Sequence, residues 1–505
     1  MSTQTATPTS TQTTTRDGRV YDTAARRELA RESVRAQLVR QPRGIPRPEG
    51  PSGTAFIMRQ FLDNNMGPIY FSELAFRYPR IAHWSVLGRH IYAINDAELI
   101  ERIHRDSARD MVKGRGLQEA KVLLGNGLLT AEGADHLRQR RMVQPAFHRD
   151  RIAEYGSRMV AATLEHEQSW HDGKSLEMTT DMSALTLDIV GRTLFSADLR
   201  EDAAGVGAAL TSLLEAFPKL MLPGGQLMSR IPGTTLHGLP AELDGLDEMV
   251  QRMIDEHRAS GDTGDLLSML IAATDEGQSM DDAQLRDEVM TLVLAGHETT
   301  AMTLTWTWYL LSENPEAAAQ LHAELADVLG GRPPTYADLA NLHVTRAIIQ
   351  ESMRLFPPAW IIGRAATEEV ELDGWRLPAG SVVLTSQFAM HRDPRYWPRA
   401  HDYLPERWLL PDGSFSEKAP AAPKGAWFPF GYGKRKCIGD QFALTEAALV
   451  LSTLAQRWSP ELLPDAEVVP LGAVTLRPRN GVPMVLRPAP GASPADDSQS
   501  SSGVQ

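Results

Sequence analysis

The chain has 505 residues, of which 42% are hydrophobic and 23% charged, the balance of an ordinary soluble globular protein. This length exceeds what one hydrophobic core usually supports, so we expect two subdomains or one unusually large fold. The 51 basic and 64 acidic residues leave a net charge of −13, which argues against nucleic acid as a partner. A single cysteine excludes an internal disulfide framework and fits a reducing cytoplasm.

The two ends of the chain differ in composition from the rest. Residues 1–16 are rich in Thr, Ser and Gln and contain no apolar run that could act as a signal peptide or a membrane anchor. We therefore expect residues 1–44 to form a disordered or solvated arm and residues 489–505 a disordered tail. The folded domain is expected at residues 45–488.

In chain order, the folded region begins with a helical run at residues 54–78 and two strand-like runs at 81–87 and 90–95. The two runs predict a hairpin at the edge of a small sheet. Helical periodicity dominates from residue 96 to residue 329. Strand patterns return later in the chain, at 369–372, 375–377, 381–386 and 473–486. The predicted fold class is mainly α with a smaller β region.

The most apolar stretch is residues 289–311, which hydropathy alone would allow to span a membrane. At its centre stand Gly296, His297, Glu298 and Thr299. Because a charged side chain in the middle of a bilayer costs about 2.5–3.5 kcal/mol, we interpret this stretch as a core helix of a large domain.

The only cysteine lies in the loop Phe430-Gly431-Tyr432-Gly433-Lys434-Arg435-Lys436-Cys437-Ile438-Gly439. A lone cysteine is more often a buried and inert side chain. Here two glycines before the sulfur permit a tight backbone, and this context favours a loop shaped around one thiolate. The pattern resembles the heme-binding loop of the cytochrome P450 family. The resemblance implies the fold of that family, as one catalytic domain, over residues 45–488.

The resemblance also implies roles for residues of two segments. In that family the cysteine is the proximal ligand of the iron of heme b, so Cys437 is the expected metal ligand, and Phe430 belongs to the same cofactor site. The segment around Thr299 resembles the oxygen-binding motif of the family. It implies that Thr299 hydrogen-bonds dioxygen, that Glu298 relays protons from solvent and that Gly296 leaves room for a diatomic ligand.

The two carboxylates of heme require cationic donors from separated parts of the chain. The resemblance assigns this task to His136 and Arg140, which form a His-x-x-x-Arg pattern often found in bacterial members, to Arg364, and to Arg435 of the cysteine loop. Taken singly, each of these residues would more often be a surface charge. Together they fit one ligand.

A further set of charged residues is expected to be structural. Glu351 and Arg354 are three residues apart on a predicted helix, a common pattern on helix surfaces. In the family, such a pair joins a second arginine, here Arg407, in a buried triad that supports the heme-side loop. We expect these three residues to act in folding or heme incorporation and to take no direct part in chemistry.

The resemblance implies a bacterial-type monooxygenase, soluble, cytoplasmic and monomeric. It would activate dioxygen and hydroxylate or epoxidise a lipophilic small molecule, such as a terpenoid, a fatty acyl chain or a polyketide-like scaffold. Residues 358–362 and 474–476, with Leu294 and Ala295, are the expected substrate contacts. Electrons are expected from a separate ferredoxin and reductase.

Basic residues cluster in sequence on two segments, at Arg138, Arg140, Arg141, His148, Arg149 and Arg151, and at Lys424, Lys434 and Lys436. They form either a patch for a small acidic electron carrier or an ordinary solvated helix face, and the sequence gives both interpretations equal weight. Two other functions stay open. One is a heme-based sensor or carrier, and the other is a peroxide-driven or rearranging heme-thiolate enzyme, against which the pairing of Glu298 with Thr299 argues.

Overall fold

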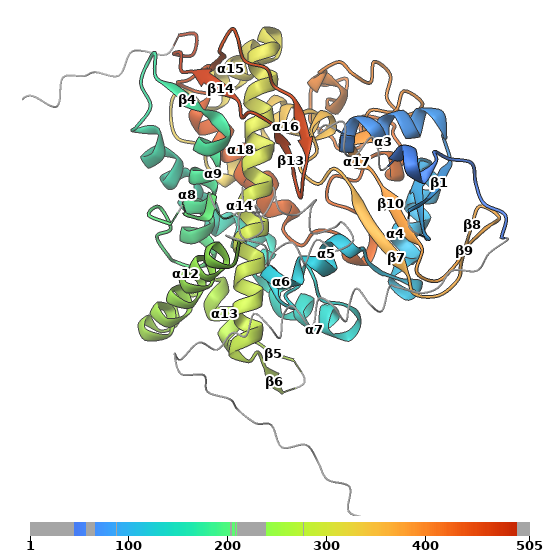
Figure 1. Cartoon of the computed structure of the whole chain (residues 1–505). Coiled ribbons are helices and arrows are strands. Elements are labelled where there is room, and N and C mark those ends of the chain that lie inside the picture. Colours follow the sequence, from blue (N-terminus) through green and yellow to red (C-terminus); the bar gives the residue numbers. More distant parts are fainter. Residues whose placement is uncertain are drawn as a thin grey trace, which may run out of the picture.

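One long helix, α14 (Asp282–Glu313), runs through the middle of the computed structural model, with helices on one side and the larger sheet on the other (Figure 1). The structure describes residues 45–491 apart from 57–65, 87, 203–204, 208, 210–238 and 276. The arm predicted at 1–44 and nearly all of the tail predicted at 489–505 lie outside the described residues.

Helix α14 is longer at both ends than the predicted stretch 289–311, and its caps explain why. The carboxylate of Asp281 accepts the backbone N–H of Gln284 at 2.8 Å and satisfies one of the free donors of the first turn. At the other end the helix stops at Asn314, and Pro315 opens the next helix, where its missing N–H costs nothing.

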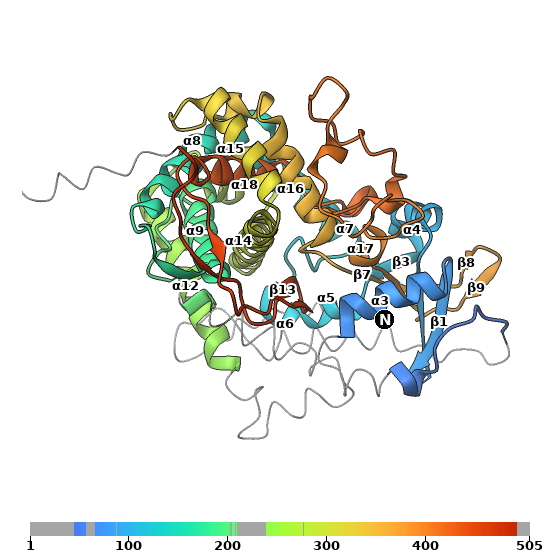
Figure 2. The same ribbon diagram turned by 90° about the horizontal axis from the view of Figure 1, so that it is seen from above.

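Most other helices pack around α14 or beside the sheet. The α-helices are α3 (Met66–Arg77), α4 (Ala97–Asp110), α5 (Arg115–Glu119), α6 (Lys121–Leu124), α7 (Gly133–Val143), α8 (Arg149–Glu167), α9 (Met178–Leu194), α12 (Leu239–Ser260), α13 (Leu266–Ala272), α15 (Pro315–Leu329), α16 (His343–Leu355), α17 (Gln387–Met390) and α18 (Asp440–Leu454). Short 3₁₀ turns are η1 (Gln144–Phe147), η2 (Tyr336–Ala340), η3 (Pro405–Trp408), η4 (Lys424–Ala426) and η5 (Gly433–Arg435). Seen from above, α14 appears end-on, with α8, α9 and α12 on one side and α3 and β7 on the other (Figure 2).

The largest sheet has five strands in the order β1-β2-β10-β7-β3. Its strands are β1 (Ile81–Val86), β2 (Arg89–Ile94), β3 (Met111–Lys113), β7 (Ile362–Ala366) and β10 (Val382–Thr385). The smaller sheets use β4 (Ser175–Glu177), β5 (Thr274–Asp275), β6 (Gln278–Ser279), β8 (Val370–Leu372), β9 (Trp375–Leu377), β11 (Glu461–Leu462), β12 (Pro470–Gly472), β13 (Leu476–Pro478) and β14 (Pro483–Val485).

The hairpin predicted near the start of the fold is confirmed, because β1 and β2 pair antiparallel and β1 is an edge of the sheet. The fold class, mainly α with a smaller β region, is confirmed as well. The main hydrophobic core surrounds α14, which packs most extensively on α9. Across the described part of the chain, no helix is both long and apolar enough to cross a membrane.

Candidate active site

The cysteine loop owes its shape to glycine at two positions. Gly431 and Gly433 have φ angles of 69° and 74°, in the left-handed region that other residues rarely adopt. A side chain at Gly433 would also collide with the backbone oxygen of His104, 2.3 Å from the added carbon. The loop closes where the N–H of Cys437 donates to the carbonyl of Phe430 at 2.9 Å, and α18 begins three residues later.

The side chain of Cys437 is exposed, and protein nevertheless surrounds much of it. These surroundings raise the pKa of the thiol by desolvation, while a hydrogen bond from the backbone of Gly439 and the charges of Arg140 and Lys436 oppose the rise. A thiol in this setting keeps its proton until a cation takes its place. An accessible sulfur of this kind is suited to bind a metal ion as thiolate.

Basic side chains from α7, β3, β7 and the cysteine loop lie close to one another. His136 of α7 is buried, and desolvation together with the charges of Lys113, Arg435, Arg140 and Arg364 lowers its pKa to about 4. The imidazole is therefore neutral. The structure thus brings together all four residues predicted from sequence for the heme carboxylates.

Lys113 is a cation of this group that the sequence reasoning missed. It lies opposite Arg364 in the antiparallel pairing of β3 with β7, and its ammonium donates to the carbonyls of Leu128 at 2.9 Å and Ala131 at 2.6 Å. Burial lowers its pKa to about 7, against the opposing effect of Glu132. The sequence alone does not indicate this role of Lys113, because only the register of β3 on β7 brings its side chain beside Arg364.

The donors of this group fit a ligand with carboxylates. Arg364 Nε and Arg435 Nη1 are buried without a hydrogen-bond partner among the described residues, a costly state for a cation. Glu132 already accepts the backbone N–H of Lys113 at 2.5 Å and pairs with Arg435 through its other oxygen. The two unused N–H groups, beside a single accessible thiol, match the propionates and the iron of heme.

Helix α14 is buried from Leu285 to Trp308 except at three residues, of which Ala295 is exposed and Gly296 and Thr299 are half-buried. The hydroxyl of Thr299 donates to the carbonyl of Ala295 at 2.9 Å. A carbon added at Gly296 would lie 3.2 Å from a methyl group of Val190 on α9, so close helix packing alone already favours glycine there. The predicted room for a diatomic ligand is a second reason for the same residue.

Glu298 lies one residue before Thr299 and is 5% exposed. Its carboxylate accepts a hydrogen bond from Thr475 at 2.8 Å and two from Arg477, each at 2.7 Å. Burial raises the pKa of Glu298, but the hydrogen bonds and charge of Arg477 outweigh it and hold the pKa below its usual value. The predicted proton relay thus falls on a carboxylate whose two oxygens are both engaged.

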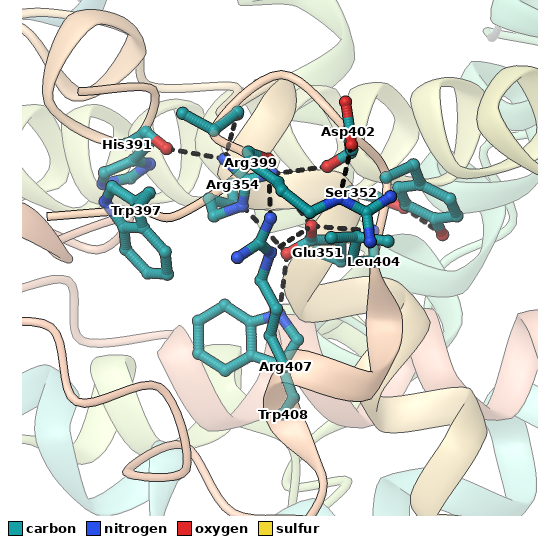
Figure 3. A network of polar contacts seen from close by, with 12 residues as sticks. Glu351, Ser352, Arg354, His391, Trp397, Arg399, Asp402, Leu404, Arg407 and Trp408 are labelled. Carbon is teal, nitrogen blue, oxygen red and sulfur yellow. Dashed lines mark hydrogen bonds and ion pairs between the residues drawn. The ribbon is translucent and has the colours of Figure 1, made fainter. Parts of the chain in front are cut away.

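The predicted triad is assembled, with Glu351 and Arg354 buried and Arg407 half-buried (Figure 3). Glu351 pairs with Arg354 at 2.8 Å and with Arg407 at 3.2 Å, and it accepts the indole N–H of Trp408 at 2.9 Å. Arg354 also donates to three backbone carbonyls, those of His391, Ala400 and Asp402. One buried ion cluster thus ties α16 to η3 and to the chain that precedes it.

This cluster reaches the cysteine loop through aromatic rings. The ring of Trp408 lies 4.7 Å from that of Trp427, and His391 Nε2 accepts the backbone N–H of Phe428 at 3.2 Å. Both contacts fall just before Phe430, where the loop begins. The geometry therefore connects Glu351 to the segment that presents Cys437.

Glu446 of α18 is a buried acid that the sequence reasoning missed. Burial raises its pKa well above the usual range, and the nearby hydroxyl of Thr300 on α14, which donates to the carbonyl of Gly296 at 3.3 Å, offsets only part of that rise. Both oxygens of its carboxyl group are buried without a hydrogen-bond partner among the described residues. Its signal was an acid within the apolar run that follows the cysteine loop.

Some of the basic residues predicted to form a patch are paired with acidic side chains, and others are not. Arg141 pairs with Asp275 at 2.6 Å, Arg151 pairs with Glu154 at 2.9 Å, and Lys436 pairs with Asp440. Arg149 and Lys434 are exposed and form no ion pair with any described residue. Lys424 is also exposed and forms no ion pair with a described residue, and its ammonium donates to the hydroxyl of Tyr432 at 3.4 Å. A patch would therefore depend chiefly on Arg149, Lys424 and Lys434.

A mainly helical fold with one accessible thiol, beside cations that have unused donors, is the arrangement expected of a heme-thiolate protein. The family model described as Cytochrome P450 matches residues 48–481. The chain belongs to the cytochrome P450 family. It is an oxidoreductase of the monooxygenase type, and its cofactor is heme.

Similar proteins agree with this assignment. Cyclooctatin synthase of Streptomyces melanosporofaciens is 42% identical over 394 residues, which cover 77% of this chain and 84% of the relative. Cyclooctat-9-en-7-ol 5-monooxygenase of the same organism is 39% identical over 68% of this chain and 75% of the relative. The crystal structure of the cytochrome P450DA heme domain matches with a TM-score of 0.75 at 26% identity, covering 85% of this chain and 95% of that one.

Proposed function

We propose that this monooxygenase oxidises a terpenoid, inserting one oxygen atom of dioxygen into a C–H or C=C bond. The observation that carries the proposal is the 42% identity to cyclooctatin synthase over 77% of the chain. The names of both Streptomyces relatives refer to terpenoids. Of the substrate classes expected from the sequence, this one is supported best.

The expected substrate contacts fall into two groups in the structure. Leu294, Trp360 and Leu476 are buried in packing. Apolar surface remains accessible at Ala295, Ala359, Ile361, Ile362 and Val474. A lipophilic ligand with few polar groups fits such a lining, because it loses little hydration on binding.

Cys437 is proposed to hold the heme iron through its sulfur. Arg364, Arg435 and neutral His136 are proposed to hold the propionates, with Phe430 shaping the loop below them. When bound, heme supplies the activation of dioxygen with two electrons and two protons. The contribution of the chain is to fix the thiolate, neutralise the propionates and keep bulk water out.

Thr299 is proposed to handle protons at the reaction site. Its hydroxyl lies at the accessible stretch of α14, and rotation about the Cβ–Oγ bond would turn its proton from the carbonyl of Ala295 toward the open side. The oxygen of the hydroxyl can accept a proton donor at the same time. One alcohol can thus pass a proton onward without a change in charge.

Electrons are proposed to come from a separate ferredoxin and reductase, to a monomeric enzyme in the cytoplasm. The proposal is tested by turnover of the purified holoprotein with a surrogate ferredoxin and reductase, using cyclooctat-9-en-7-ol and a fatty acid of similar size. We expect an oxygenated product from the terpenoid only. Oxidation of the fatty acid alone would overturn the substrate class, and no turnover of any lipophilic compound would favour a sensor or carrier.

The role of Cys437 has its own measurement. The reduced protein with carbon monoxide should show the absorption band of a thiolate ligand, and Cys437→Ser should lose that band. A band that persists in the serine variant would remove Cys437 from the iron.

A further inference from the structure

Residues 473–477, which comprise the turn after β12 and the start of β13, are held to the centre of α14 by one carboxylate. Three hydrogen bonds reach Glu298, one from the hydroxyl of Thr475 and two from the guanidinium of Arg477. The side chains of Glu298 and Arg477 are 7% and 17% exposed. A charged pair with this geometry and burial holds its partners more firmly than a surface pair.

Two indole rings fasten the same segment at its other residues. Trp306, two turns further along α14, donates its indole N–H to the carbonyl of Leu476 at 2.9 Å. Trp360 donates to the carbonyl of Ala473 at 2.9 Å. A carbon added at Gly472 would lie 2.7 Å from the Trp360 ring, so the ring fits closely against the backbone.

Between these anchors, Val474 keeps 48% of its surface exposed although its neighbours are bonded on both sides. On α14, Ala295 lies one turn before Glu298, and Thr299 is the residue directly after Glu298. The carboxylate therefore joins the turn that carries Ala295 and Thr299 to the segment that presents Val474. All three residues belong to the accessible surface assigned above to the reaction site.

We propose that Glu298 is a positioning residue, which with Thr475 and Arg477 sets the place of residues 473–477 relative to Thr299 and so determines how a substrate is oriented. The inference rests on the proposed function, because it takes the surface around Thr299 as the binding site. It assigns Glu298 a task other than the proton relay expected from the family motif. A relay needs a carboxylate that exchanges protons with solvent, whereas this one is held ionised by an arginine.

The pocket is probed with imidazole and with 1-phenylimidazole and 4-phenylimidazole, whose ring nitrogen binds the heme iron of the holoprotein. We expect Glu298→Gln to leave the Kd of imidazole within about twofold of the wild-type value. The Kd of each phenylimidazole should change on the order of tenfold, because that factor corresponds to the loss of one hydrogen bond to a charged group. Thr475→Val should change the Kd of the two phenylimidazoles in the same direction, by a smaller factor.

Amide hydrogen exchange gives a readout that needs no ligand. The amides of residues 473–477 should exchange on the order of tenfold faster in Glu298→Gln, because local opening becomes easier. Glu324→Gln is the matched control, since Glu324 also accepts three hydrogen bonds, from Val344 and Thr345, at the distant start of α16. This control should change neither the exchange of residues 473–477 nor the azole affinities.

A double variant covers the case in which an unpaired charge unfolds a single variant. Glu298→Gln with Arg477→Gln removes both charges, and its effects on azole binding and exchange should be no larger than those of Glu298→Gln alone. The proposal is overturned if azole affinities and amide exchange in Glu298→Gln both match the wild type. Slower dioxygen consumption with a raised solvent isotope effect in that same variant would then indicate a proton relay. Neither readout requires turnover, so failure of the terpenoid assay would count against the substrate class alone.

Discussion

Arg140 donates a hydrogen bond of 2.8 Å to the backbone carbonyl of Lys436, the residue before Cys437. The residue predicted from sequence as a partner of heme carboxylates thus also supports the backbone next to the sulfur. Its charge is one of those that oppose the rise in the pKa of the thiol. The same guanidinium thus supports the loop and offsets part of the cost that burial places on the thiolate.

We therefore predict that Arg140→Leu loses heme faster. A hydrogen bond from a charged donor contributes about 1.5–3 kcal/mol, so heme transfer to apomyoglobin should accelerate by about tenfold or more. Arg158→Leu is the control, since Arg158 donates to the carbonyl of Arg192 at 3.1 Å on the far pair α8 and α9. Equal rates of heme transfer in the two variants would show that Arg140 has no special role at the loop.

Thr299→Ala should bind heme normally and waste reducing equivalents as hydrogen peroxide. Positioned proton donors contribute about 10²-fold or more, so substrate oxidation should fall by about that factor while electron uptake continues. The measurement is peroxide and product per electron pair consumed. Thr307→Ala, which removes a buried hydroxyl bonded to Thr303 two turns further along the helix, should stay coupled. Tight coupling in Thr299→Ala would exclude the assignment.

The sequence predicts those parts of the site in which local spacing decides the outcome. Glu351 and Arg354 share a helix turn, and the cysteine loop carries its own glycines, so both could be assigned without a structure. The partner of Glu298 could not be predicted, because Arg477 lies 179 residues away and many arginines have the same charge. Lys113 was missed for a similar reason, since only the register of β3 on β7 brings it beside Arg364.

The same limit applies to side chains that pack instead of binding. Trp360 was expected at the substrate, because residues 358–362 resemble a substrate-contact region of the family. In the structure it fits between Gly67 and Gly472, where added carbons would lie 2.6 and 2.7 Å from its ring. Sequence gives the chemical type of a residue, whereas the small residues that face it come from other parts of the chain.

Glu351→Ala should fail to accumulate as a stable heme-loaded protein. Removing one member of a buried ion pair leaves Arg354 uncompensated and costs about 3–5 kcal/mol. Heme content and the midpoint of urea unfolding measure this. Asp402→Asn breaks an ion pair of the same cluster, with Arg399 at 2.7 Å, but both side chains are largely exposed, so the cost should be at most about 1 kcal/mol. A stable, fully loaded Glu351→Ala protein would contradict the structural role.

Glu288 of α14 should make the free energy of unfolding depend on pH. Its carboxylate accepts the backbone N–H of Leu128 at 3.0 Å, and burial raises its pKa to about 8. A raised pKa in the folded state means that the folded protein holds the proton more tightly than the unfolded chain. The stabilising contribution is complete below pH 4.5 and is lost as the pH rises through about 8.

Urea midpoints measured from pH 5 to pH 9 test this dependence. In the wild type this group should lower stability by up to roughly 1.4 kcal/mol per pH unit between pH 5 and about 8, and its contribution should level off above that pH. Glu288→Gln should remove this component. Glu324→Gln, which alters another glutamate that accepts backbone N–H groups, is the control and should keep the wild-type slope. An unchanged slope in Glu288→Gln would show that the carboxyl group is ionised in the folded protein.

The electron-donor surface is tested at Arg149 and Lys434, two exposed basic residues that form no ion pair with any described residue. Arg149 opens α8 and Lys434 lies in the cysteine loop, and α8 packs on α18, the helix that follows this loop. Reversing both charges, as Arg149→Glu with Lys434→Glu, should slow reduction by ferredoxin about tenfold at low ionic strength. The difference should shrink as salt is raised, because exposed charges are screened beyond about 10 Å at 0.1 M. Arg77→Glu, at the exposed last residue of α3, is the control and should be reduced at the wild-type rate. Equal rates in the wild type and both variants would show that Arg149 and Lys434 are ordinary solvated charges.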